Sequence, residues 1–223
     1  MTVEEVMSRL NGLGTEANRL NYRKHGAGVN LCGVSFANLD KLSKSIVRDT
    51  ALARELWATG NVDARCLATM IADPAQLAES ELDFWANTIT YPVLGELFAR
   101  NVVSLSQYGQ SRMEAWMQSP HDVTCQIAWD LLAIQARHED GLTDGYFAAY
   151  IDQVEARMKK AANRTRHAMN GALIAIGLRS EPLRALALAA AGRIGTVQVD
   201  HGETGEFTPD AATMLKRSKA RKK

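Results

Sequence analysis

The chain is a series of short segments in which apolar residues recur every three or four positions. This periodicity constrains its fold more than any other feature. Ser35 and Thr50 stand where they could cap two of these segments, and Ser80 and Ser180 stand before two others. The pattern continues through 106–118, 122–137, 143–161, 163–178 and 183–194. Strand character is confined to TVQVD at 196–200, so we expect an all-α protein.

The number and length of these segments select one kind of helical architecture. Helices of about 10 to 15 residues joined by short links are too short and too numerous for a four-helix bundle. Antiparallel helix pairs stacked side by side fit better, which is an α-α superhelix, or α-solenoid. We therefore predict a single helical-repeat domain over 1–215, followed by a basic tail over 216–223.

Charge is distributed unevenly along the 223 residues. The net charge is +1, yet the last eight residues contain six Lys and Arg and no acid, so the chain before them carries −5. A body that grips duplex DNA over its whole surface is usually basic. The acidic body therefore counts against strong DNA binding by the whole fold, but not against a local basic face.

Cysteine use and hydropathy narrow the class of protein further. Cys32, Cys66 and Cys125 are far apart, and no Cys/His cluster has zinc spacing, so we expect reduced thiols, no metal and no cofactor. The acidic N-terminus is unlike a signal peptide. The apolar run at 183–195 is interrupted by Arg184 and Arg193 and is too short to span a bilayer. We expect a soluble, cytoplasmic protein without a membrane partner.

One segment resembles a known family. ELWATGNVDARCLATMIADPAQLAESELDFWANTITYPVLGELF, at 55–98, has Leu-Trp before a Gly-Asn turn, Asp-Ala-Arg before an apolar helix, and Asp-Pro ending that helix. RKHGAGVNLCGVSFANLDKLSKSI before it, and MNGALIAIG and VQVDHGETGEFTPDA after it, extend the likeness over nearly the whole chain. Together they resemble the DNA alkylation repair family, which is built of HEAT-like repeats.

The resemblance implies a concave, basic surface that holds duplex DNA. Active members cleave the N-glycosidic bond of a methylated, positively charged purine. That reaction develops positive charge on the sugar, so a nearby carboxylate stabilises the transition state and orients water. Aromatic rings attract the cationic base, and Arg and Lys hold the phosphates.

The catalytic set of the family is not carried over intact. The resemblance places Tyr91 at the aromatic position and Gly95 at the position of the essential aspartate. Glu96 is adjacent, but one step along a helix turns a side chain by about 100°. Glu96 is therefore either a surface acid or a replacement carboxylate reached by a shift in the helix start.

Two later segments also depart from the family pattern. A family tryptophan falls at Gly171, a phosphate-contacting arginine at Ile174, and another arginine near Gln126. Trp129 and Asp130 stand beside this last position. They are either a half-buried tryptophan with a surface acid or a relocated aromatic-acid pair.

Two groups of basic residues are candidates for contact with DNA phosphates. Such groups more often form a solvated surface than a contact with DNA. The first lines one face of a predicted helix, and the second spans two helices. The first group is Lys41, Lys44 and Arg48; the second is Arg157, Lys159, Lys160, Arg164, Arg166 and His167.

A loop near the C-terminus contains Asp200, His201 and Glu203. Such residues ligate metals, but the spacing is unspecific, and bonds to backbone groups explain them equally well. The first functional hypothesis is that the chain is a DNA-binding relative of alkylpurine glycosylases. Under this hypothesis the sequence leaves open whether the chain also excises N3- or N7-alkylated purines. The alternative is a non-catalytic HEAT-like scaffold that binds a protein or another ligand.

Overall fold

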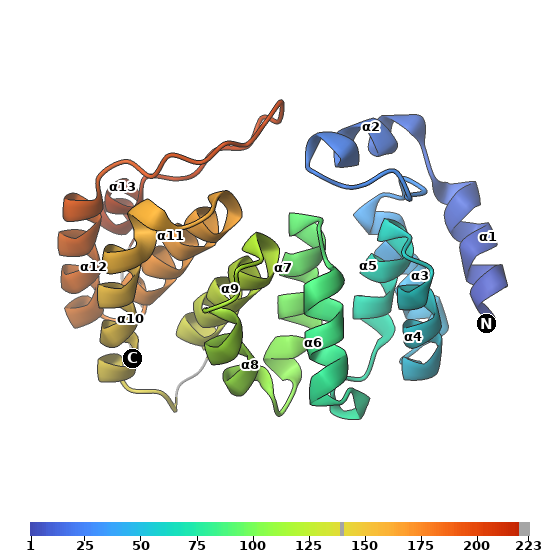
Figure 1. Cartoon of the computed structure of the whole chain (residues 1–223), viewed down its shortest axis with the longest axis horizontal. Helices are drawn as coiled ribbons and strands as arrows, with labels where there is room; N and C mark the ends of the chain where they lie inside the picture. Colours follow the sequence, from blue (N-terminus) through green and yellow to red (C-terminus); the bar gives the residue numbers. More distant parts are fainter. Residues whose placement is uncertain (139–140, 219–223) are drawn as a thin grey trace. The chain divides into compact units, whose positions relative to one another are not determined.

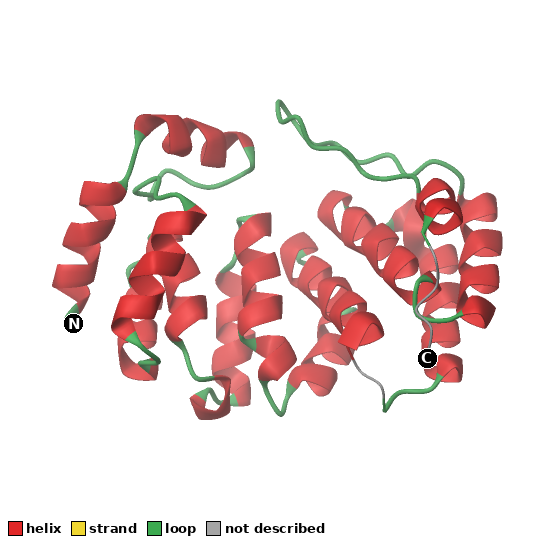
Figure 2. Cartoon of the chain, turned by 180° about the vertical axis from the view of Figure 1, so that it is seen from behind, coloured by secondary structure: helices red, strands yellow, loops and turns green. Residues whose placement is uncertain are grey.

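The computed structural model describes residues 1–138 and 141–218, and over these residues the chain forms helices joined by loops (Figures 1 and 2). No strand occurs in this part of the chain, so TVQVD at 196–200 is a loop and its expected strand character is wrong. The chain divides into two compact units. Unit 1 comprises Met1–Arg112 with Gly202–Thr204, and unit 2 comprises Met113–His201 and the residues from Gly205 onward.

Unit 1 consists of short helices in two layers. Its elements are α1 (Val3–Leu13), α2 (Glu16–Lys24), α3 (Phe36–Ile46), α4 (Thr50–Ala58), α5 (Val62–Ile71), η1 (Pro74–Gln76), α6 (Glu79–Thr88), α7 (Pro92–Asn101) and η2 (Val103–Leu105). Helix α5 packs on its neighbour in sequence, α4, and on the helices two before and two after it, α3 and α7. Contact between alternate helices is the packing of an α-solenoid, so the predicted fold class is confirmed within this unit.

The core of unit 1 is centred on stacked aromatic rings. Trp57 and Trp85 lie parallel with ring centroids 4.0 Å apart, and Phe98 lies 5.9 Å from each. The guanidinium of Arg65 lies 5.2 Å from the Trp57 ring and donates to the carbonyl of Thr88. These contacts join α4, α5, α6 and α7, and both tryptophans are packing residues of the core.

A buried carboxylate joins α5 to an extended segment thirty residues earlier. Asp63 is 1% exposed, and its side chain accepts hydrogen bonds from the amides of Cys32 (2.6 Å), Gly33 (3.0 Å) and Val34 (2.7 Å). Gly33 has φ +79°, and a Cβ on it would lie 2.7 Å from the carbonyl oxygen of Thr15. The segment therefore needs both the acid and the glycine in order to pass between α2 and α5.

Unit 2 repeats the two-layer arrangement. Helix α8 (Gly109–Trp116) crosses the division between the units. It is followed by α9 (Asp122–His138), α10 (Asp144–Arg157), η3 (Met158–Lys160), α11 (Asn163–Gly177), α12 (Glu181–Ile194) and α13 (Ala211–Arg217). Helix α11 packs on α9, α12 and α13, and α10 packs on α12. The last helix includes Lys216 and Arg217, so these two residues of the predicted basic tail are helical; 219–223 lie outside the described residues.

The packing of helices around α11 depends on Gly177 and on the buried Arg179. A Cβ on Gly177 would lie 2.6 Å from Leu215 and 2.8 Å from Ala187, so a side chain there would separate α11 from α12 and α13. Arg179 is 3% exposed and donates to the carbonyls of Ala136 and Leu142. It thereby ties the start of α12 to the end of α9 and to the approach to α10.

Several helix starts differ from the sequence expectation. Asp49, not Thr50, caps α4, because its carboxylate accepts from the Leu52 amide. Helix α6 begins at Glu79, two residues before the expected start, and Glu81 accepts from the Ala78 amide. Asp210 caps α13, which the apolar pattern of the sequence did not predict.

Replacing Asp63 by Asn should lower the free energy of unfolding by about 3 kcal/mol, because one accepting oxygen becomes an NH2 group that faces backbone donors. Urea denaturation followed by tryptophan fluorescence measures this. The matched control is Asp40→Asn, which breaks only the exposed Asp40–Lys44 ion pair of 2.7 Å and should cost about 0.5 kcal/mol or less. Equal effects of the two substitutions would contradict a structural role for Asp63.

Candidate nucleic-acid interface

The start of α7 carries the residues for which the resemblance predicts chemistry. Tyr91 is the residue that precedes the helix, Pro92 is its first residue, and Gly95 is buried in the first turn. Glu96 is exposed, on a different side of the helix from Gly95. The structure therefore places a buried backbone position, and not a carboxylate, where active family members are expected to hold their acid.

Tyr91 is buried at the start of α7 and packs against α2. It is 3% exposed, and its ring centroid lies 6.2 Å from that of Tyr22 in α2. The Tyr22 hydroxyl donates to the Val34 carbonyl at 2.6 Å, and burial raises the pKa of Tyr22 to about 12. A Cβ on Gly26 would lie 3.7 Å from Cδ of Pro92, so the loop after α2 also reaches the start of α7. Tyr91 thus packs inside unit 1, with almost none of its surface open to a base.

Trp129 and Asp130 lie in α9, in very different surroundings. Trp129 is fully buried, with the Tyr150 ring edge-on at 6.4 Å and the Arg157 guanidinium 5.6 Å from its centroid. Asp130 is half-buried and accepts a hydrogen bond from Gln126 at 3.1 Å. Trp129 is a packing residue in this structure, because a base could not stack on a ring that has no exposed face.

Two positions in α11, Gly171 and Ile174, are ones at which the resemblance predicts side chains that contact DNA. A Cβ on Gly171 would have no atom within 4 Å, so the site of a family tryptophan is open space. Ile174 is buried at the position where the resemblance predicts a phosphate-contacting arginine. These two positions therefore carry neither the aromatic nor the cationic side chain that the resemblance predicts.

In the second basic cluster, the lysines are exposed to solvent and the arginines contact other parts of the protein. Lys159 and Lys160 in η3 are exposed. Arg166 donates to the carbonyls of Gln198 and Ala161, and Arg164 lies 4.0 Å from Glu206. Arg157 donates to the Met117 carbonyl in addition to lying over the Trp129 ring. Phosphate contact is therefore open to the two lysines, while the arginines hold parts of unit 2 together.

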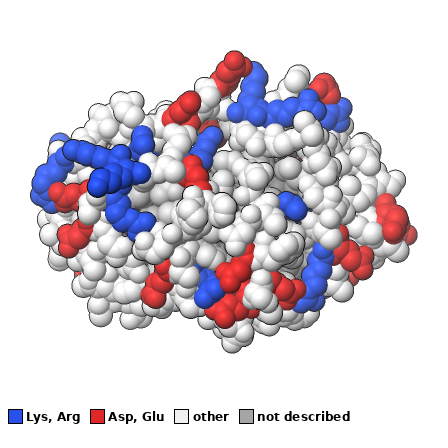
Figure 3. Space-filling model, viewed as in Figure 1, with Lys and Arg blue, Asp and Glu red and all other residues white. Residues whose placement is uncertain are grey.

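The first basic cluster does not lie along one helix. Helix α3 ends at Ile46, so Arg48 belongs to the link after it, where it lies 3.6 Å from Asp73. Lys44 forms an ion pair with Asp40 at 2.7 Å, and Lys41 is exposed. The expected single row is wrong, because Val47 turns the chain out of the helix with φ +65°. In the view of Figure 3, positive side chains gather in separate patches with neutral and acidic surface between them.

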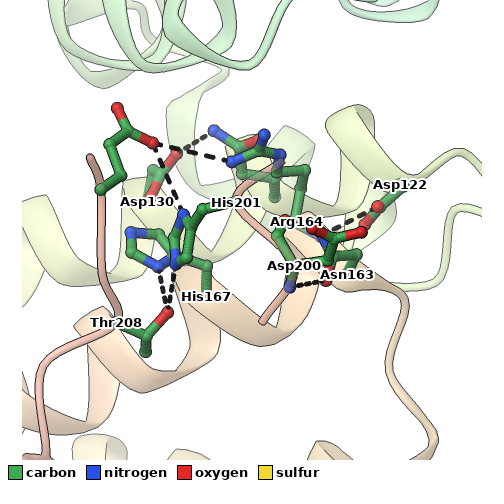
Figure 4. A network of polar contacts seen from close by, with 10 residues as sticks. Asp122, Asp130, Asn163, Arg164, His167, Asp200, His201 and Thr208 are labelled. Carbon is green, nitrogen blue, oxygen red and sulfur yellow. Dashed lines mark hydrogen bonds and ion pairs between the residues drawn. The ribbon is translucent and has the colours of Figure 1, made fainter. Parts of the chain in front are cut away.

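A network of polar contacts holds the loop before α13 onto α11 (Figure 4). His167 Nδ1 and His201 Nε2 both lie 2.9 Å from the Thr208 hydroxyl. The amide group of Asn163 exchanges two hydrogen bonds with the backbone of Asp200. The expected bonds from the Asp200 and His201 side chains to backbone groups are not the ones found, because Asp200 bonds through its backbone to Asn163 and the His201 ring bonds the Thr208 hydroxyl. No cluster of three His, Cys, Asp or Glu side chains that could hold a metal occurs in the described part of the chain.

The start of α11 is capped from another helix. The Asp122 carboxylate, at the start of α9, accepts from the amides of Arg164 (2.9 Å) and Thr165 (2.7 Å) and from the Thr165 hydroxyl. These donors could otherwise bind an anion, but here an internal acid satisfies them. A cavity of about 440 Å³ beside them is lined by Asp122, Cys125, Arg157, Lys160 and Thr165, among others.

Comparison with known proteins assigns the chain to a family. The family described as DNA alkylation repair enzyme matches residues 6–215. The chain belongs to this family. Relatives include the uncharacterized proteins Lin0241 of Listeria innocua, 23% identical, and Lmo0209 of Listeria monocytogenes, 24% identical; each match covers at least 99% of both chains. No helix among the described residues is long and apolar enough to cross a membrane.

A solved structure is similar over almost the same length. It is described as a new family of proteins related to the HEAT-like repeat DNA glycosylases with affinity for branched DNA structures. The match has a TM-score of 0.89 and 25% identity, and it covers 97% of this chain and 93% of the other. The predicted family and HEAT-like fold class are therefore confirmed.

Sequence reasoning missed the contacts that shape this region. Asp63, Asp122 and Thr208 act on backbone or side-chain groups 7 to 43 residues away. In the sequence, each of these residues is only an acid or a hydroxyl near the start of a helix. That pattern predicts a cap of the same helix and gives no sign of a contact with a distant segment.

The His167 environment predicts a pH dependence of stability. Burial, followed by the nearby His201 and Arg164, lowers the pKa of His167, whereas Glu206 opposes the shift. The unfolded chain therefore binds a proton at a higher pH than the folded chain, and stability should fall as pH drops below about 6.5. His167→Asn should reduce this slope, by at most about 1.4 kcal/mol per pH unit.

Urea denaturation between pH 5 and about 7.5 measures this slope. The matched control is His121→Asn at an exposed position, which should leave the slope of the wild type unchanged. An unchanged slope in His167→Asn would contradict this account.

Proposed function

We propose that the chain binds DNA, branched DNA in preference to plain duplex, and that it does not excise bases. The observation that carries the proposal is Gly95. Glycosidic cleavage needs a group that stabilises positive charge on the sugar. At the position where the family resemblance expects that carboxylate, this chain has a buried glycine beside a buried tyrosine.

The nature of the DNA is suggested by the similar solved structure. That protein is described as having affinity for branched DNA structures, and the likeness extends over nearly both full lengths. A protein that keeps the family scaffold but lacks its acid can still use the scaffold to bind DNA. Branched DNA offers unstacked bases and closely spaced phosphates, which a rigid helical framework can select by shape.

Lys159 and Lys160 are the best-supported phosphate contacts in unit 2. They are adjacent and exposed in η3, and they flank the loop into α11, whereas the neighbouring arginines are used inside the protein. Each phosphate contact releases bound counterions, so binding should weaken as salt rises. An acidic body with a few exposed cations favours selective DNA binding over general DNA binding.

The test compares a three-way junction with a duplex of the same arm sequences, by fluorescence anisotropy over a range of salt concentrations. A parallel assay counts bases released from duplex containing N7-methylguanine. We expect tighter binding to the junction and no release above the rate without protein. Base release with turnover would refute the absence of excision. Salt-independent or absent DNA binding would favour the alternative, a scaffold for a protein ligand.

A double substitution locates the phosphate contacts within this experiment. Lys159→Gln with Lys160→Gln should reduce the slope of log K against log salt concentration by roughly 1.8, if each lysine contacts one phosphate. The matched control is Lys44→Gln, since Lys44 already pairs with Asp40, and it should leave the slope unchanged.

A further inference from the structure

The loop after α2, residues 25–30, is held by hydrogen bonds at both of its ends. On one side, the Ala27 amide donates to the Tyr22 carbonyl at 2.9 Å. On the other side, Asn30 is held three times: it donates to the Thr59 carbonyl, accepts from the Asn61 side chain, and accepts at its own carbonyl from the Val62 amide. Gly28 and Val29 lie between these two anchored points. The loop is therefore fixed at both ends, and at its tip the Val29 carbonyl accepts from the Leu31 amide at 3.0 Å.

The tip presents an apolar side chain to solvent. Val29 is 84% exposed, the highest value among the large hydrophobic residues of the described chain. A lone exposed apolar residue needs no explanation on most surfaces. Here, however, it stands at the end of an anchored loop, and a Cβ on Gly26 in the same loop would lie 3.7 Å from Pro92 at the start of α7.

Two cations precede the loop. Arg23 and Lys24 are exposed in the last turn of α2, and within the described part of the chain neither forms an ion pair with an acid. Lys44 and Arg48 of the same unit, by contrast, are each within 4 Å of an aspartate. Arg23 and Lys24 can therefore bind an external anion without first losing an internal partner.

We propose that residues 23–29 form a DNA-contacting element of unit 1. Arg23 and Lys24 hold backbone phosphates, and Val29 packs against an unstacked base at the branch point. The proposal rests on the proposed function, and it assigns the part of unit 1 that recognises the branch. An apolar side chain on a preorganised loop gains contact with an exposed base face, while a fully stacked duplex offers no such face.

The start of α7 supports this choice of surface. The loop lies at the end of α7 where Pro92 and Gly95 begin the helix, which is the end where the family resemblance places contact with DNA. An exposed Leu105 follows the opposite end of the same helix. Leu105 thus provides a matched apolar residue in the same unit, away from the proposed element.

The experiment measures binding of the full chain to a three-way junction and to duplex, with 2-aminopurine at the branch. Val29→Ser should lower junction affinity about tenfold, leave duplex affinity nearly unchanged, and remove the fluorescence change of 2-aminopurine. Leu105→Ser is the matched control and should behave as wild type. Arg23→Gln with Lys24→Gln should reduce the salt slope by roughly 1.8 on both DNAs.

The outcomes separate this inference from the proposed function. If the wild type binds neither DNA, the proposed function fails and the inference fails with it. If the wild type binds the junction but Val29→Ser and the double variant bind as well as wild type, the inference alone is wrong. Circular dichroism of each variant checks that the substitution leaves the helices intact.

Discussion

The bond between Asp63 and three consecutive backbone amides is the constraint on which unit 1 depends. A carboxylate that is 1% exposed is costly to bury unless its oxygens are satisfied, and here Cys32, Gly33 and Val34 satisfy them. The extended segment has no helical hydrogen bonds of its own, so its amides need an external acceptor. The acid and the segment therefore each supply what the other lacks.

This constraint reaches the candidate interface through a few contacts. With Val34 fixed, its carbonyl accepts from Tyr22, and Tyr22 packs against Tyr91 at the start of α7. The same segment includes Asn30, which anchors the loop that carries Val29. The burial of Tyr91 and the exposed position of Val29 thus both depend on how the segment 30–34 is held in place. A scaffold of this kind can lose a catalytic acid and keep a surface that fits DNA.

The sequence predicted most of the helices, but it predicted the surroundings of individual side chains only in part. Apolar periodicity found the segments that became α3 to α12, and Ser35 and Ser180 cap helices as expected, since these signals are local. Arg48 was placed on α3 because periodicity cannot show that Val47 ends the helix. The burial of Trp129 by Tyr150 and Arg157 depends on residues 21 and 28 positions later, which no local pattern contains. Absence of the acid at position 95 was visible in the sequence; the covering of Tyr91 was not.

Amide hydrogen exchange at residues 32–34 tests the central claim most directly. Because Asp63 satisfies these three amides inside the core, they should exchange only when unit 1 unfolds, as slowly as the most protected amides of α5. Val29 is an exposed residue four positions from Gly33, and its amide should exchange quickly in the same sample. Fast exchange at Cys32, Gly33 and Val34 under native conditions would show that the segment opens locally, and the account of a rigidly mounted interface would be wrong.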